Sequence, residues 1–300
     1  LTIHSIGSSG TLIIISLNTL IRFSWKLAWL ALLFLSFSLS GCVSSPFYYP
    51  DQVVYNTPAN AGLKFENVVF ASGDGTRLTG WFIPATGYQN PKNAKGTVVH
   101  FHGNAQNMSA HWQFVAWLPQ RGFNVFVFDY RGYGASQGSP EPKGVFEDSN
   151  AALNYVRSRK DIDSERLLIL GQSLGGTNAI AVVGSGNRAG VKAIAIEATF
   201  SSYSSIANDK ISGAGALVDN TYSAENYVAN LAPIPLLLLH GTSDPVIPYA
   251  HSLRLLDKAH EPKTMVTVEG GGHIEALTPR FGGKYQEALL DFFDASLSHK

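Results

Sequence analysis

The 300-residue chain has a single cysteine and no net charge, and each shortage excludes a kind of protein. Because Cys42 is alone, an intramolecular disulfide is impossible and a cysteine-based metal site is not expected. Lysine plus arginine and aspartate plus glutamate number 22 each, so the composition predicts no nucleic-acid partner. A near-neutral or mixed substrate fits this balance better. Apolar residues make up 45% of the chain, enough for one substantial core.

Charge is also scarce near the start of the chain, where Arg22 and Lys26 are the only charged residues among the first 50. They precede an apolar run over residues 27–39, which small residues follow. A positive flank, an apolar segment and then small residues form the layout of a secretory signal peptide. A membrane-spanning helix needs about 20 apolar residues, so this run is short for a span.

The end of the apolar run predicts how the protein is anchored. Leu39-Ser40-Gly41-Cys42 resembles the bacterial lipobox, in which the cysteine is acylated and becomes the mature N-terminus. We therefore expect a lipoprotein-type signal peptide over 1–42 and lipidation at Cys42. The protein would then be lipid-anchored to a membrane of the bacterial cell envelope, on its periplasmic or extracytoplasmic face. The alternative is an uncleaved signal anchor followed by a buried cysteine.

The mature chain is expected to consist of a tether and one domain. Residues 43–63 are rich in Ser, Pro, Tyr and Asn without clear periodicity, which predicts a tether. The domain over 64–300 should begin with an antiparallel hairpin, because two strand-like runs flank the turn signal Asp74-Gly75. An excess segment over about 199–231 is richer in Ser, Asn, Gly and Ala and predicts a small cap.

After the hairpin, apolar strands alternate with helix-length segments. Their near-continuous Val, Ile, Leu and Phe content indicates strands buried on both faces, as in a parallel sheet covered by helices. The predicted fold class is therefore α/β, with a doubly wound and mostly parallel sheet. The strands are expected at 65–71, 77–83, 97–101, 124–128, 166–170, 191–196, 235–240 and 264–268, and the helices at 109–120, 143–159, 174–184, 248–259 and 281–297.

The pattern G-x-S-x-G occurs twice, around Ser136 and around Ser173. A nucleophile elbow needs a strand before the serine and a helix after it, so that a strained turn exposes the hydroxyl above the sheet. Ser173 has both, because Leu167-Leu168-Ile169-Leu170 precedes it and a helical segment rich in small residues follows. Ser136 lies in a loop that leads into Ser139-Pro140. We therefore predict Ser173 as the nucleophile and a turn-forming role for Ser136.

A serine hydroxyl needs a general base, usually a histidine, that a carboxylate orients. Downstream of an elbow of this kind the chain order is acid and then histidine. Asp244 directly follows the apolar strand at 235–240, and His273 follows three glycines after the next strand. We predict Asp244 as the acid and His273 as the base. Glu197 and Asp129 are rival acids, since each ends a predicted strand.

His100-Phe101-His102-Gly103-Asn104 ends an earlier strand, where this arrangement places a backbone donor for a developing oxyanion. The predicted donors are the N–H groups of Asn104 and of Leu174, the residue after the nucleophile. Zinc is a competing explanation for His100 and His102. Alternate residues on a strand point to opposite faces, however, so the two cannot easily chelate one ion, and no metal is expected. No phosphate-binding glycine loop occurs either, so no cofactor is expected.

Several motifs together resemble the alpha/beta-hydrolase superfamily, and within it the branch that includes small protein depalmitoylases and their bacterial relatives. The resemblance runs from about residue 64 to the C-terminus. It rests on His102-Gly103-Asn104-Ala105-Gln106-Asn107, Asp129-Tyr130-Arg131-Gly132-Tyr133-Gly134, the elbow at 171–176, His240-Gly241-Thr242-Ser243-Asp244 and Gly272-His273. It implies an alpha/beta-hydrolase fold and ester or thioester hydrolysis through an acyl-enzyme. The superfamily also contains peptidase-like members, and the lipobox-like N-terminus departs from an intracellular depalmitoylase.

The expected function is therefore that of a membrane-anchored serine esterase or thioesterase acting on a small-molecule or lipid-like ester, such as a palmitate ester. One alternative is a peptidase-like or acyl-peptide hydrolase, which usually needs an added domain to select a peptide terminus. The other is a non-catalytic envelope protein that keeps the hydrolase fold. The complete Ser, Asp and His set favours the enzyme.

Overall fold

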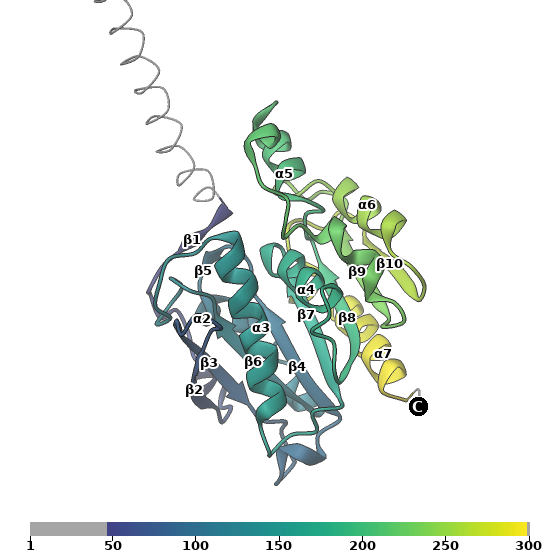
Figure 1. Ribbon diagram of the computed structural model, residues 1–300. Coiled ribbons are helices and arrows are strands. Elements are labelled where there is room, and N and C mark those ends of the chain that lie inside the picture. Colours follow the sequence, from purple (N-terminus) through teal and green to yellow (C-terminus); the bar gives the residue numbers. More distant parts are fainter. Residues whose placement is uncertain (1–46, 299–300) are drawn as a thin grey trace, which may run out of the picture. The chain divides into compact units, whose positions relative to one another are not determined.

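The computed structural model describes residues 47–298, so the predicted signal peptide at 1–42 and the lipidation site Cys42 lie outside the described residues. The centre of the domain is an eight-stranded sheet with the order β10-β9-β8-β7-β4-β6-β3-β2 (Figure 1). Its antiparallel part consists of β2 (Glu66–Ala71) and β3 (Arg77–Ile83), and β3 continues antiparallel to β6. The parallel strands are β4 (Gly96–Phe101), β6 (Phe123–Asp129), β7 (Leu167–Gln172), β8 (Val191–Glu197), β9 (Leu236–Gly241) and β10 (Lys263–Val268). The predicted fold class and hairpin are confirmed.

Helices cover both faces of the sheet, and each face has its own apolar core. The alternation along β7 shows the division, since Leu167 and Ile169 belong to one core and Leu168 and Leu170 to the other. The first core is closed by α3 (Pro142–Ser158), α4 (Leu174–Gly184) and α6 (Ala250–Lys258), and the second by α7 (Lys284–Ser298) with the segment after β4.

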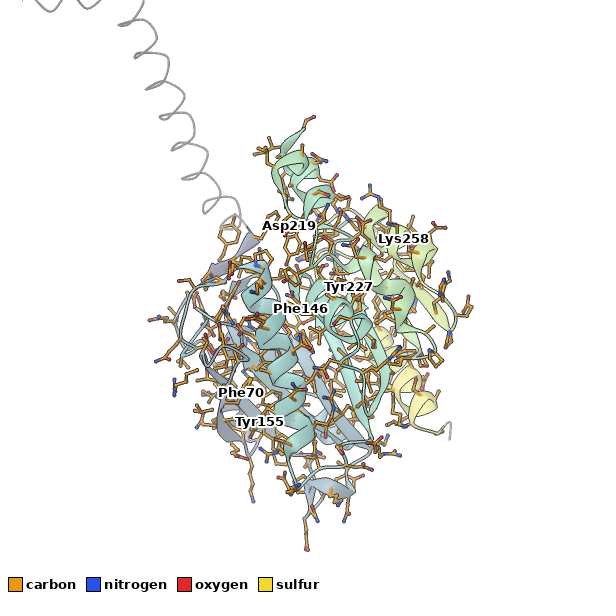
Figure 2. All side chains as sticks on the ribbon, viewed as in Figure 1. Phe70, Phe146, Tyr155, Asp219, Tyr227 and Lys258 are labelled. Atoms are coloured by element: carbon orange, nitrogen blue, oxygen red, sulfur yellow. The ribbon has the colours of Figure 1, made fainter. Side chains whose placement is uncertain are left out.

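The hairpin is joined to α3 by aromatic packing. Phe70 on β2 stacks on Tyr155 of α3 with ring centroids 5.2 Å apart, and Figure 2 shows the two labelled side chains together at this edge. Arg159, just past the end of α3, lies over the ring of Phe82 on β3 at 3.9 Å. These contacts fix the antiparallel strands to the parallel part of the sheet.

The single helix predicted over 109–120 is wrong. The segment forms α2 (Met108–His111) followed by the 3-10 turns η4 (Trp112–Phe114) and η5 (Pro119–Arg121). Its fully buried side chains, Trp112, Val115 and Leu118, recur every three residues, which is the period of a 3-10 helix. Three apolar residues at that spacing face one core, and an α-helix would turn the stripe away from it.

Between β8 and β9 the chain forms α5 (Tyr203–Lys210) and the 3-10 turns η6 (Ala214–Leu217), η7 (Ala224–Asn226) and η8 (Val228–Leu231). Figure 1 shows α5 beyond the end of the sheet at which β7 leads into α4. This segment is the small cap expected at about 199–231. Among residues 47–298, no helix has both the length and the hydropathy required to cross a membrane.

The tether predicted over 43–63 is wrong for its described part, because residues 47–55 pack against the domain as a strap. The N-terminal strap contains β1 (Tyr49–Pro50), which pairs in parallel with β5 (Ala105–Gln106) in a separate two-stranded sheet. The Tyr48 side chain is buried, and its hydroxyl lies 3.1 Å from that of Tyr203 in the cap. The sequence pattern of this segment predicts a linker, but its aromatic residue Tyr48 packs against the domain.

Candidate active site

Ser173 occupies the turn between β7 and α4, at the carboxyl edge of the parallel strands. Its φ of 53° and ψ of −123° are strained for a residue with a side chain, as a nucleophile elbow requires. Glycines make the turn possible. A Cβ at Gly175 would overlap the carbonyl oxygen of Phe101, and one at Gly171 would lie 2.7 Å from Cα of Gly176. The backbone can therefore turn tightly and lift the serine hydroxyl out of the sheet.

The structure brings Ser173, His273 and Asp244 together in one hydrogen-bonded row. Oγ of Ser173 lies 3.0 Å from Nε2 of His273, and Nδ1 of His273 lies 2.8 Å from Oδ2 of Asp244. With Asp244 ionised, Nδ1 carries the proton and donates it to the carboxylate, which leaves Nε2 as the acceptor for the serine hydroxyl. Residues 100 positions apart thus form the arrangement of a nucleophile, a base and an acid.

The carboxylate of Asp244 is buried and fully used. Oδ1 accepts hydrogen bonds from the N–H groups of Val246 and Ile247, at 2.8 and 2.9 Å. Oδ2 accepts the hydrogen bond from Nδ1 of His273 and also lies 3.3 Å from Nε2 of His240. Burial alone would raise the pKa of Asp244, but the hydrogen bonds from His240 and His273 hold it well below its usual value. The acid therefore stays ionised throughout the neutral range.

The rival carboxylates do not contact His273. Glu197 accepts hydrogen bonds from Nε2 of Gln172 at 2.7 Å and from the N–H of Ala276 at 2.8 Å, and burial raises its pKa. Asp129 accepts the N–H of Met108 at 2.6 Å, and burial raises its pKa to about 7. Each carboxylate accepts a hydrogen bond from a backbone N–H. The one from Ala276 to Glu197 fixes the turn that carries His273.

Ser136, the other pentapeptide serine, is buried in a turn. Its hydroxyl donates to the carbonyl of Asp129 at 2.8 Å and accepts the N–H of Thr79 at 2.9 Å. These two bonds join the loop after β6 to strand β3. The hydroxyl is thus fully engaged, and the structure places no histidine on it.

The two predicted oxyanion donors belong to segments that adjoin Ser173. Leu174 is the first residue of α4, so its N–H has no acceptor within the helix. The loop of Asn104 runs beside the nucleophile, since a Cβ at Gly103 would lie 3.6 Å from Cβ of Ser173. Nδ1 of His102 donates to the carbonyl of Gly103 at 2.7 Å. In a trans peptide the next N–H points the opposite way, so this bond turns the Asn104 amide away from the His102 ring.

His100 and His102 have separate partners. Nε2 of His100 donates to Oε1 of Gln172 at 2.8 Å, and burial lowers its pKa to about 3, so it is neutral. Nε2 of the same Gln172 side chain donates to Oε2 of Glu197. A buried chain thus runs from β4 through the elbow to the turn of His273. Among residues 47–298, no three or more His, Cys, Asp or Glu side chains are grouped as a metal site.

Backbone strain is concentrated around this site. Among the described residues other than glycine, four have positive φ: Gln106 at 62°, Ser173 at 53°, Ala198 at 52° and Ile274 at 49°. Ala198 follows Glu197, and Ile274 follows His273. Such conformations each cost about 1 to 3 kcal/mol and persist only where the surroundings impose them. The fold therefore tolerates this strain at Ser173 and next to Glu197 and His273.

Three supporting residues carry no role in the sequence-based prediction. His240 is the second histidine on Asp244, Gln172 joins His100 to Glu197, and Tyr133 donates to the carbonyl of Asn104 at 2.7 Å. Each lies within a motif used for the family resemblance. Their signal is that a polar side chain at a buried strand end, or directly before a turn glycine such as Gly134, needs a partner.

A strained serine elbow at the carboxyl edge of a mostly parallel sheet, with a histidine and a buried carboxylate against it, defines a hydrolase of the alpha/beta-hydrolase class. Solved structures agree on the fold. An esterase of Pyrococcus furiosus, Pf2001, superposes with a TM-score of 0.68 at 19% identity, covering 84% of this chain and 98% of that one. An alpha/beta hydrolase from Vibrio vulnificus gives 0.62 at 21% identity, covering 78% and 82%.

Sequence comparison identifies the family. The model of the prolyl oligopeptidase family matches residues 108–300, and the chain belongs to that family. The Escherichia coli K12 protein YfhR is 49% identical over 254 residues, which is 84% of this chain and 87% of that protein. Human alpha/beta hydrolase domain-containing protein 17B is 31% identical over 210 residues, 68% of each chain. The latter similarity agrees with the resemblance to the depalmitoylase-like branch.

Proposed function

We propose that the protein is a serine hydrolase that cleaves carboxylic esters or thioesters through an acyl-enzyme. The observation that carries this proposal is the continuous row from Ser173 through His273 to Asp244. Oγ of Ser173 attacks the carbonyl carbon while Nε2 of His273 takes the hydroxyl proton, and Asp244 stabilises the resulting imidazolium. The amides of Asn104 and Leu174 face the oxygen that becomes negative.

The tetrahedral intermediate then breaks its bond to the alcohol or thiol, and His273 gives the proton to that leaving group. Water enters, His273 takes its proton, and the hydroxide attacks the acyl carbon. The second intermediate releases the acid and returns the proton to Oγ of Ser173. Every proton passes through one imidazole, which the buried carboxylate of Asp244 holds in place.

An ester or thioester substrate is supported by the size of the cap and by the structural neighbours. The cap between β8 and β9 consists of α5 and short 3-10 turns, and the described part of the chain has no additional domain that would select a peptide terminus. The Pyrococcus furiosus structure is that of an esterase. A peptidase is the second candidate, and the name of the matching family model favours it.

One experiment separates these candidates. Purified protein is assayed with p-nitrophenyl acetate, butyrate and palmitate, with palmitoyl thioesters, and with aminoacyl and prolyl p-nitroanilides. We expect ester or thioester kcat/KM to exceed that of any anilide by orders of magnitude, together with an acyl adduct on Ser173 detectable by mass spectrometry. Faster anilide cleavage would replace the esterase proposal with the peptidase. A chain inert toward all of them would support the non-catalytic alternative.

We also propose that the enzyme is held at the cell-envelope membrane through lipid on Cys42. The support is the order of Arg22 and Lys26, the apolar run and Leu39-Ser40-Gly41-Cys42. Acyl chains gain about 0.8 kcal/mol per buried CH₂, so two or more hold a protein stably at a bilayer. Metabolic labelling with an alkyne-tagged fatty acid, in wild type and Cys42→Ala, tests this. Equal labelling of both proteins would refute the anchor.

A further inference from the structure

The loop that carries the predicted oxyanion donor is held at every carbonyl from residue 102 to residue 106. The hydroxyl of Tyr130 donates to His102, the ring of His102 to Gly103, Tyr133 and the N–H of Tyr49 to Asn104, the ring of His111 to Ala105, and the N–H of Asp51 to Gln106. The distances run from 2.7 to 3.2 Å. Five consecutive bonded carbonyls outside a regular helix or large sheet indicate a loop whose orientation is fixed.

Two of these bonds come from the backbone of the N-terminal strap. The N–H of Tyr49 lies 2.8 Å from the carbonyl of Asn104, and the N–H of Asp51 lies 3.2 Å from that of Gln106. In the other direction, the side-chain amide of Asn107 in the loop donates to the strap, to Oδ1 of Asp51 at 2.7 Å and to the carbonyl of Val53 at 2.8 Å. Strap and loop are thus joined in both directions.

The strap contacts the part of the loop that contains Asn104, the predicted oxyanion donor. The two peptide groups that flank Cα of Asn104 are each fixed through a carbonyl, the first by His102 and the second by Tyr133 and Tyr49. With both planes fixed, the direction of the Asn104 N–H is fixed as well. Gln106, two residues on, is held at φ 62°, a conformation that needs support from its neighbours.

The strap also contacts the cap. The hydroxyl of Tyr48 lies 3.1 Å from that of Tyr203 on α5, and the ring of Phe47 meets the same tyrosine edge-on at 5.0 Å. The N–H of Gly134 donates to the carbonyl of Asp51 at 2.8 Å, which ties the strap to the loop that carries Tyr133. The strap therefore lies between the cap, the Tyr133 loop and the oxyanion loop.

We propose that the N-terminal strap is a working part of the active site, in which the Tyr49 backbone together with Tyr133 positions the Asn104 amide to stabilise the oxyanion. Neither residue is a catalytic residue, because each acts through the Asn104 carbonyl. The role assigned to residues 47–55 is thus to keep the oxyanion hole formed before substrate arrives, so that no rearrangement is needed during the reaction.

The test compares full-length variants. Tyr49→Pro removes the N–H donor, whereas Tyr49→Ala keeps it, so the difference between the two measures the hydrogen bond. Tyr133→Phe removes the second donor to the same carbonyl. Val54→Ala, at an exposed strap position, is the matched control. With p-nitrophenyl butyrate we expect kcat to fall several-fold in Tyr49→Pro and in Tyr133→Phe, with KM nearly unchanged. The double variant should approach the loss of one oxyanion donor, about 10² to 10³ in kcat.

A second measurement does not depend on turnover. Amide hydrogen exchange of the strap peptide that contains Asp51, whose N–H donates to the carbonyl of Gln106, should accelerate in the double variant while the sheet strands keep their protection. Unchanged kcat, or unchanged exchange of this peptide, in the folded double variant would overturn the inference. So would exchange that accelerates equally over the whole domain, because the strap would then support only stability. The exchange result stands even if the wild type turns over no ester, which separates this inference from the proposed function.

Discussion

Oδ2 of Asp244 lies 2.8 Å from Nδ1 of His273, and the carboxylate that makes this contact is completely buried. A buried carboxylate on Nδ1 fixes the tautomer of the ring and makes Nε2 the acceptor. The low pKa of Asp244 keeps this interaction at any pH at which the protein is expected to work. The contact with Asp244 therefore orients the base independently of Ser173.

Replacement of Asp244 by asparagine should abolish most of the activity without unfolding the protein. The amide of the new side chain could offer its N–H to Nδ1 of His273, which would reverse the tautomer and place a proton on Nε2 facing Ser173. We expect kcat to fall by about 10³ to 10⁴ with a small change in KM. Steady-state kinetics with p-nitrophenyl butyrate measure this. A variant within tenfold of wild type would show that another carboxylate serves as the acid.

Glu197→Gln addresses that rival directly. A glutamine can accept only one of the two hydrogen bonds that Glu197 accepts, so either Gln172 or the Ala276 N–H loses its partner. Leaving a buried donor unpaired costs about 1 to 3 kcal/mol. We expect a lower melting temperature and a loss of kcat well below that of Asp244→Asn, because the turn of His273 is loosened but the triad remains. The reverse order of the two kinetic effects would make Glu197 the catalytic acid.

Ser136→Ala separates the two serine pentapeptides. Its hydroxyl bridges Thr79 and Asp129, so removing it should destabilise the domain by about 1 to 3 kcal/mol. Esterase kcat should stay within about twofold of wild type at a temperature well below the unfolding transition. Denaturant unfolding and ester turnover measure the two effects. Loss of turnover in a folded Ser136→Ala protein would contradict the assignment of the nucleophile.

The buried carboxyl of Asp129 should make stability depend on pH. Burial raises its pKa to about 7, against about 3.9 in an unfolded chain, and the groups that face it are His102 at 3.5 Å and Asp51. Between about pH 4 and 7 the native state holds a proton that the unfolded state has released. The contribution of Asp129 to stability therefore falls as pH rises through this window and is constant outside it.

Asp129→Asn removes this titration while keeping an acceptor for the N–H of Met108. Relative to wild type, the variant should gain about 2 to 4 kcal/mol of unfolding free energy as pH rises from 4 to 7. Urea unfolding at several pH values measures the difference. A difference that is independent of pH would show that Asp129 is ionised in the native protein throughout this range.

Much of the fold could be predicted because the parallel strands are buried on both faces and so read as continuous apolar runs. Strands β4 and β6 to β9 follow this rule. The edge strand β10 is only partly buried, yet its Val266 and Val268 still mark it as a strand. The helix at 109–120 failed because Trp112, Val115 and Leu118 repeat every three residues, a spacing that also suits part of an α-helical stripe.

Likewise, only some of the residues at the candidate site could be predicted from the sequence. Ser173, Asp244 and His273 could be nominated because strand ends in a parallel sheet meet at one edge, and their order in the chain matches the elbow. The strap could not. β1 has only two residues and no periodicity, and Tyr48 meets a partner 155 residues away. Short segments that are held by distant hydrogen bonds leave no pattern in the local sequence.

The most direct test of the central claim is covalent labelling of the nucleophile. Wild-type protein and Ser173→Ala are incubated with a fluorophosphonate probe, and labelling is read by in-gel fluorescence and by mass spectrometry of the peptide that contains residue 173. The account predicts stoichiometric labelling on Ser173 and none in Ser173→Ala. Labelling that persists in Ser173→Ala, or a folded wild type that the probe leaves unlabelled, would contradict it.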